Sequence, residues 1–318
     1  MAELQSYQTI QTPSAKVLAV AINRDASRCA AGDRDGFIHI IDMASGEVLR
    51  KLKQHVEFVY CLAFLPDGHL LSAGKDKSIR EWDIESGTFL KDYAGIFVTK
   101  SARSLSAQSL RAEARSHSMT ILSIAVTDDN YMATASQDKL VKLWKDGDPI
   151  RTCDWHTGPV TCVRFQPGTN IMYSASRDKT IRAWSPSNGA VLHRYNGHLG
   201  EIVGLEFIDE SSFVSVDVLG NVLIWNADVE QPLGQIYAAS GRVMCASLLR
   251  KHHQLLVGLE NGGIEAVDVR FDDLPELQKA TASATLHSSE VRCIAATDDD
   301  RFASCDNSGK VILWKYSG

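Results

Sequence analysis

The stretch HVEFVYCLAFLPDGHLLSAGKDKSIREWD, residues 55–83, places four polar or aromatic landmarks among short apolar runs. His55 opens it, Ser72 stands ten residues before Trp82, and Asp76 stands six residues before Trp82. The apolar runs between them are too short for independent helices, and turn residues separate them, so they are predicted to be strands. The stretch therefore predicts a small antiparallel sheet with polar side chains at fixed places.

The same frame recurs along the chain. Each of four further tryptophans has a His 27 or 28 residues before it and a Ser or Thr ten residues before it. In two of the four sets the Asp place holds Leu219 or Ser308, with Asp217 and Asp306 two residues earlier. The recurring residues are His117, Thr134, Asp138 and Trp144; His156, Ser174, Asp178 and Trp184; His198, Ser215 and Trp225; and His287, Ser304 and Trp314.

Two more strands fit the frame with an aliphatic residue in the Trp place. They end near Ile41 and Val267, and they bring the number of units to seven at a period near 40 residues. Such a period predicts a propeller array. These two units have lost the polar set, since Ser14 and Ala31 in one, and Ser240 and Val257 in the other, occupy its His and Ser/Thr places.

These residues resemble the WD-repeat family over nearly the whole chain, including the pairs Gly197-His198 and Trp82-Asp83. The resemblance implies an all-β, seven-bladed propeller whose blades have four antiparallel strands. It also implies that His, Asp, Ser/Thr and Trp are hydrogen-bonded within a blade as a structural tetrad. Buried polar groups of this kind are costly unless each has a partner.

The two ends of the chain predict how the ring closes. The chain ends four residues after Trp314, which leaves the last blade without an outer strand. The segment Tyr7–Gln11 stands where an outer strand would precede the first blade. We expect it to complete the last blade, so that residues 1–318 form a single propeller.

Composition and motifs narrow the function. The chain has 44% hydrophobic residues and a net charge of −6, which argues against a surface that binds nucleic acid throughout. No catalytic or nucleotide-binding motif is present, so we expect no enzyme activity, no cofactor and no metal. The start lacks a signal peptide and no run is long enough to span a membrane, which favours an intracellular, cytoplasmic protein, with the nucleus an alternative. The seven scattered cysteines, predicted to be reduced, are Cys29, Cys61, Cys153, Cys162, Cys245, Cys293 and Cys305.

A basic sector is predicted on one face. The spacing of 62 residues between Trp82 and Trp144 implies an insertion between blades two and three, about residues 95–118, with four basic residues and one acid. Its sequence favours either a short helix over Ser104–Arg115 or a disordered loop, and Arg103–Ser106 is a candidate phosphorylation site. The candidate partner-binding residues are Lys75, Lys77, Lys100, Arg103, Arg111, Arg115, Lys139, Arg177 and Lys179.

The functional hypothesis is a non-enzymatic scaffold that binds other proteins within a larger complex. Clustered Arg and Lys suit an acidic or phosphorylated partner. The alternatives are an RNA- or ribosome-associated propeller, supported by the basic insertion, and a substrate receptor of a ubiquitin ligase. The second rests on a partial match to a docking motif at Val267-Asp268-Val269-Arg270.

Overall fold

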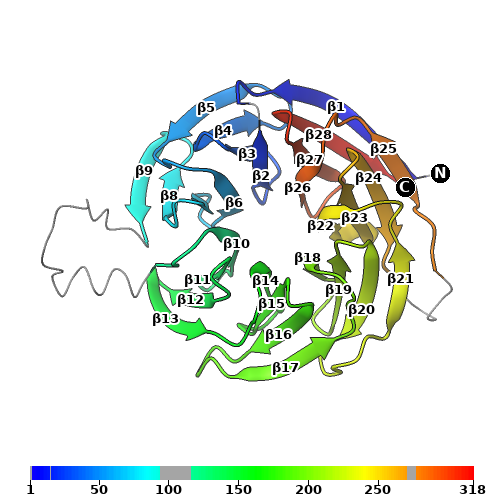
Figure 1. The fold of residues 1–318 in the computed structure, drawn as a ribbon. Helices are drawn as coiled ribbons and strands as arrows, with labels where there is room; N and C mark the ends of the chain where they lie inside the picture. Colours follow the sequence, from blue (N-terminus) through cyan, green and yellow to red (C-terminus); the bar gives the residue numbers. More distant parts are fainter. Residues whose placement is uncertain (1, 15, 94–115, 271–276) are drawn as a thin grey trace, which may run out of the picture.

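The computed structural model describes residues 2–14, 16–93, 116–270 and 277–318, and within them the strands form seven separate four-stranded antiparallel sheets. Figure 1 shows the sheets arranged as blades around a central axis, with the first strand of each blade innermost. The all-β, seven-bladed propeller predicted from the spacing of the repeats is confirmed. No helix in these residues is long and apolar enough to cross a membrane.

Blades one to four follow the chain in order. Their strands, from the innermost outward, are β2 (Val17–Ile22), β3 (Arg28–Asp33), β4 (Phe37–Asp42) and β5 (Val48–Lys53); β6 (Val59–Phe64), β7 (Leu70–Gly74), β8 (Ile79–Asp83) and β9 (Thr88–Asp92); β10 (Ile121–Val126), β11 (Tyr131–Ser136), β12 (Val141–Lys145) and β13 (Asp148–Cys153); and β14 (Val160–Phe165), β15 (Met172–Ser176), β16 (Thr180–Trp184) and β17 (Val191–Asn196).

Blades five to seven complete the ring, and a short 3-10 helix, η1 (Arg250–His252), follows the first strand of blade six. Their strands are β18 (Ile202–Phe207), β19 (Ser212–Asp217), β20 (Asn221–Asn226) and β21 (Gly234–Ala238); β22 (Val243–Leu249), β23 (Gln254–Leu259), β24 (Gly263–Asp268) and β25 (Ala282–Thr285); and β26 (Val291–Ala296), β27 (Arg301–Asp306), β28 (Lys310–Ser317) and β1 (Glu3–Gln11).

The N-terminal strand β1 is the outer strand of blade seven, as predicted (Figure 1). It pairs antiparallel with β28 from Glu3 opposite Ser317 to Gln11 opposite Lys310, and is therefore longer than the Tyr7–Gln11 segment expected from the sequence. The Tyr7 hydroxyl also donates a hydrogen bond to the carbonyl of Met43, 3.0 Å away in the first repeat. The first segment of the chain thus ties the last blade to the first.

The core lies between neighbouring blades. Trp82 packs in one buried cluster with Ile38 and Ile40 of the preceding blade. Ile41 and Val267, which replace Trp in blades one and six, pack in the same way on the blade before them. A buried indole removes about 150–250 Å² from water, worth at most about 4–6 kcal/mol, which exceeds the ~1 kcal/mol net value of a hydrogen bond. Inter-blade packing is therefore the main stabilising force.

Candidate interaction surface

The polar landmarks of blade two form one hydrogen-bonded chain. The Trp82 indole N–H donates to Ser72 Oγ at 2.7 Å, and Ser72 Oγ lies 2.7 Å from His55 Nε2. Nδ1 of the same imidazole lies 2.9 Å from Asp76 Oδ2, and Arg80 donates to that carboxylate at 2.8 Å. The His55 ring and Ser72 are fully buried, and each polar side-chain atom of His55, Ser72, Asp76 and Trp82 has a partner.

Blades three and four have the same arrangement. Each His contacts an Asp through Nδ1 and a Ser or Thr through Nε2, and the Trp donates to the same hydroxyl. The distances are 3.0, 2.9 and 3.0 Å for His117–Asp138, His117–Thr134 and Trp144–Thr134, and 2.7, 2.8 and 2.7 Å for His156–Asp178, His156–Ser174 and Trp184–Ser174.

Blades five and seven keep the contact with a different aspartate. Asp217, the last residue of β19, lies 3.1 Å from His198 Nδ1, and Asp306, the last residue of β27, lies 2.9 Å from His287 Nδ1. The sequence frame suggested a departure at the Asp place, but the structure shows that the contact itself is retained. Both carboxylates are fully buried, so neither contributes an exposed negative charge to the surface of the propeller. In both blades the His Nε2 atom contacts a serine hydroxyl, Ser215 or Ser304, and the indole N–H of Trp225 or Trp314 donates to the same hydroxyl.

Blades one and six use different buried polar contacts, which the sequence analysis missed. In blade one, Asp33 Oδ2 lies 3.0 Å from His39 Nε2, and both side chains are almost fully buried. In blade six, Glu265 accepts hydrogen bonds from the Tyr237 hydroxyl at 2.6 Å and from the backbone N–H of Ser240. His39 and Glu265 both stand two residues before the aliphatic residue in the Trp place. Blades two to four also have an ionisable residue there, Arg80, Lys142 and Arg182, so the sequence alone does not mark the contacts of blades one and six.

The buried contacts shift the pKa of both partners. Burial alone would raise the pKa of Asp76, but its bonds to His55 and Arg80 outweigh burial and hold the pKa at about 2. His117 and two backbone N–H groups likewise lower the pKa of Asp138 to about 2. Burial lowers the pKa of His55, so its neutral form is favoured in the folded protein.

All five repeat histidines have both ring nitrogens occupied by contacts within the blade. They therefore hold the loop before each first strand against the turn between the second and third strands. Because adjacent strands run antiparallel, these loops and turns lie at the same end of every blade. We call this end the top face.

Three lysines of the predicted basic sector have an unusual backbone conformation. The residue five places before the Trp place has positive φ in all seven blades: it is glycine in four blades, but Lys77, Lys139 and Lys179, at φ 65°, 73° and 69°, in blades two to four. Side chains at such φ values cost of order 1 kcal/mol relative to glycine. All three lysines are exposed, and none takes part in an ion pair within the described residues.

The two other described cations of the sector are partly neutralised. Lys75 Nζ lies 3.1 Å from Glu57 Oε2, and Arg177 Nε lies 3.5 Å from Glu201 Oε2. Lys100, Arg103, Arg111 and Arg115 of the insertion lie outside the described residues, as does the segment Ser104–Arg115. Among the described residues, the structure therefore brings Lys77, Lys139 and Lys179 to one face as the exposed cations of the sector that have no acidic partner.

The top face also carries exposed apolar side chains. Leu199 is 74% exposed and Leu219 is 62% exposed, and with Lys179 and Arg242 they line a hollow of about 640 Å³ that spans blades four to six. Sequence reasoning missed this hollow because residues from three blades form it. The large apolar residues exposed in the top-face loops and turns are Val56, Met119, Trp155, Leu199, Leu219 and Leu286.

The cysteines do not form a reactive site. All seven are free, and Cys61 and Cys162 on the innermost strands are buried. Burial raises the pKa of Cys29 to about 12, which keeps the thiol protonated at neutral pH.

The comparison with known proteins places the repeats in a family. The family model described as WD domain, G-beta repeat matches residues 4–42, 46–83, 108–145, 147–185 and 279–315, which is more than half of the chain. The chain is 26% identical to mouse telomerase protein component 1 over 76% of its length, but this covers only 9% of that protein. It is 27% identical to transcription initiation factor TFIID subunit 5 of Caenorhabditis elegans, over 53% of the chain and 23% of that protein.

A third relative is closer in size. The chain is 24% identical to the guanine nucleotide-binding protein subunit beta of Arabidopsis thaliana, over 61% of the chain and 51% of that protein. The chain thus spans about half of this relative and a tenth to a quarter of the other two. With five matched repeats and a closed ring of four-stranded blades, the chain belongs to the WD-repeat family, WD domain, G-beta repeat.

Proposed function

We propose that this propeller is a non-catalytic intracellular scaffold whose top face binds an acidic or phosphorylated segment of another protein within a larger complex. The observation that supports the proposal most directly is the left-handed backbone at Lys77, Lys139 and Lys179. Four blades have glycine at this place, so the fold itself does not require lysine there. Retained backbone strain is a reasonable basis for a functional hypothesis, because a residue that only served the fold would be expected to relieve it.

The apolar side chains of the top face complete the proposed binding surface. Monomeric proteins seldom expose clustered large apolar residues without a partner to cover them. Leu199 and Leu219 stand beside Lys179 and Arg242 in one hollow, which suits a segment with a bulky apolar residue next to acidic ones. Mouse telomerase protein component 1 and the TFIID subunit carry names of multiprotein assemblies, which agrees with a scaffold role.

A glycine triple variant tests the proposal without straining the fold. Lys77→Gly, Lys139→Gly and Lys179→Gly together restore the residue that the other blades use, so stability should not fall by much. A control with the same loss of charge is Arg24→Ala, Arg50→Ala and Lys279→Ala, all exposed and away from the top face. Affinity purification followed by mass spectrometry should recover the same partners with the wild type and the control, and lose them with the glycine variant.

A second pair of variants, one test and one control, examines the apolar hollow. Leu199→Ser with Leu219→Ser should weaken partner capture, whereas Leu49→Ser with Leu192→Ser, on the outer strands β5 and β17, should not. Partners that bind all variants equally would contradict the proposed surface.

The alternative hypothesis, that the top face binds RNA, needs a test that distinguishes it from protein binding. Phosphate contacts made by several cations weaken steeply with salt, so filter binding of RNA over a salt series would show a steep slope that the glycine variant reduces. Tight, salt-dependent RNA binding by the wild type would replace the protein-scaffold proposal. Charge reversal of Arg103, Arg111 and Arg115 in the same assays tests whether the basic insertion contributes, and it leaves the His117 tetrad of blade three intact.

A further inference from the structure

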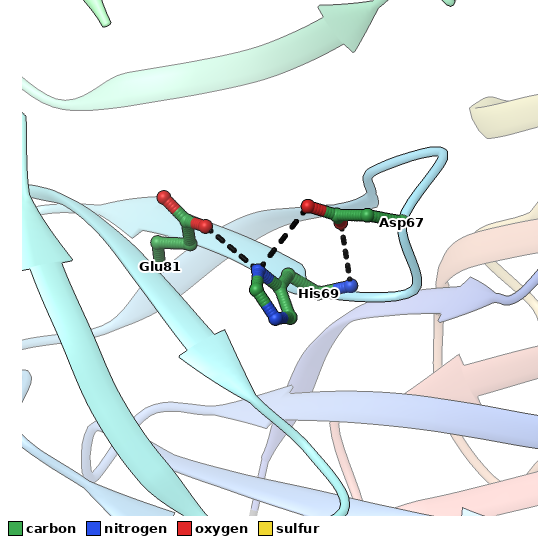
Figure 2. A group of neighbouring side chains, drawn as sticks. All are labelled: Asp67, His69 and Glu81. Atoms are coloured by element: carbon green, nitrogen blue, oxygen red, sulfur yellow. Dashed lines mark hydrogen bonds and ion pairs between the residues drawn. The ribbon is translucent and has the colours of Figure 1, made fainter.

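A separate group of polar side chains lies on blade two at the end opposite the top face. Asp67 and His69 stand in the turn between β6 and β7, and Glu81 lies on β8. Figure 2 shows the His69 ring between the two carboxylates. Its Nδ1 atom lies 2.9 Å from Glu81 Oε1 and 3.4 Å from Asp67 Oδ2, and one ligand atom from each residue lies within 4.8 Å of the others.

The second oxygen of each carboxylate accepts a hydrogen bond from a group other than the His69 ring. Asp67 Oδ1 accepts the backbone N–H of His69 at 3.0 Å (Figure 2). Glu81 Oε2 accepts the hydroxyl of Tyr93, which follows β9. These contacts leave Asp67 Oδ2 and Glu81 Oε1 directed at the imidazole. Outer partners of this kind orient the ligands of protein metal sites.

We propose that Asp67, His69 and Glu81 bind a zinc ion, with water in the remaining position. Zinc lies about 2.0–2.2 Å from imidazole nitrogen and carboxylate oxygen, so donors around a tetrahedral ion are about 3.3 Å apart. The observed separations of 2.9 and 3.4 Å lie on either side of that value. The ion takes the place of the proton that Nδ1 shares with Glu81, and the Asp67 and Glu81 oxygens, within 4.8 Å of one another, draw together around it.

The donor set selects the class of metal. One imidazole nitrogen with two carboxylates suits zinc and similar first-row divalent ions, whereas calcium and magnesium take oxygen ligands. A zinc ion also places two positive charges beside the two carboxylates. The Asp67 side chain is 60% exposed, which gives the ion a path from solvent, while Glu81 is 14% exposed and anchors the site.

Calorimetric titration of the chelator-treated protein with zinc chloride tests the site. The wild type should bind one more zinc ion than His69→Ala or Glu81→Gln. Tyr93→Phe keeps the ring but removes the hydroxyl that holds Glu81, and should weaken zinc binding about tenfold. Magnesium and calcium should produce no saturable binding at this site.

A second His–carboxylate contact provides the control. His252 Nε2 lies 3.0 Å from Asp300 Oδ1 on blades six and seven, but it faces a single carboxylate. His252→Ala should therefore keep the zinc site. Circular dichroism of each variant checks that it is folded. Equal zinc binding by the folded wild type and His69→Ala overturns the proposal, and so does an absence of saturable binding in the wild type, which would leave only an ion pair at this position.

Discussion

Asp217 Oδ2 lies 3.1 Å from Nδ1 of His198, although Asp217 stands two residues earlier in its blade than the aspartates of blades two to four. Asp217 ends strand β19, and its other oxygen accepts the backbone N–H groups of Leu219 and Asn221. One carboxylate therefore shapes the turn and satisfies the histidine at once. In blade three two residues share these tasks: Ser136 ends the strand and accepts the N–H of Asp138, and Asp138 reaches the histidine and accepts the N–H of Leu140.

This relationship predicts that the aspartate that contacts the histidine is equally important for stability whether it stands six residues before the Trp, like Asp138, or eight, like Asp217. His55→Ala, Asp138→Ala and Asp217→Ala should each destabilise the fold by about 1–3 kcal/mol, because each leaves a buried polar partner unsatisfied. Asp128, whose side chain is 78% exposed, supplies the control, and Asp128→Ala should change stability by less than about 0.5 kcal/mol. Thermal and denaturant unfolding would measure the differences. An unchanged midpoint in His55→Ala and Asp138→Ala would remove the structural role from the tetrads.

In blade one, the buried contact between Asp33 and His39 takes the place of a tetrad, and we expect the two residues to be energetically coupled. Asp33 and His39 are buried and lie 3.0 Å apart, so Asp33→Ala and His39→Ala should not be additive. Each single variant leaves one buried partner without its contact, whereas the double variant removes both, and we expect a coupling of about 0.5–3 kcal/mol. A double-mutant cycle by denaturant unfolding measures this quantity. Additive effects would mean that the two side chains act separately.

Deleting residues 1–12 should destabilise the whole propeller, unlike removal of a loose tail. The deletion removes strand β1, its pairing along β28 and the Tyr7–Met43 contact between the last and first blades. A clear fall in the thermal midpoint is expected. Tyr7→Phe is the milder companion, because it removes only the hydroxyl and should cost about 0.5–1.5 kcal/mol. A truncated protein that melts at the wild-type temperature would contradict closure by β1.

Acidification should destabilise the protein in two stages. The pKa values of His55 and His156 are lowered by burial, so the unfolded chain takes up protons first as pH falls below about 6.5, and stability declines. The pKa values of Asp76 and Asp138 are about 2 in the fold, so their contribution is present above about pH 4 and is lost as pH falls toward 2. Thermal midpoints measured from pH 7.5 to 3 at constant ionic strength check this. Asp76→Asn should show a smaller loss below pH 4, and a midpoint that rises on acidification would contradict both assignments.

Much of the fold could be predicted because each blade is almost one contiguous repeat. The spacing of Trp144, Trp184 and Trp225 places three blades without any knowledge of long-range contacts. The polar residues at fixed offsets identify the strands and turns, since a buried imidazole and indole need partners at defined distances along the same sheet. The closing strand was predictable for the same reason: blade seven lacks an outer strand in its own stretch of sequence.

The sequence by itself determined the number of blades, the tetrads of blades two to four and the use of the N-terminal segment to close the ring. Only the tertiary structure decided which aspartate reaches His198, that Glu265 bonds to Tyr237 of the neighbouring blade, and that Leu199 and Leu219 meet Arg242 in one hollow. The physical reason is that a repeat pattern fixes the backbone frame within a blade. Contacts between blades, and the reach of a side chain around a turn, depend on how the finished sheets pack against one another.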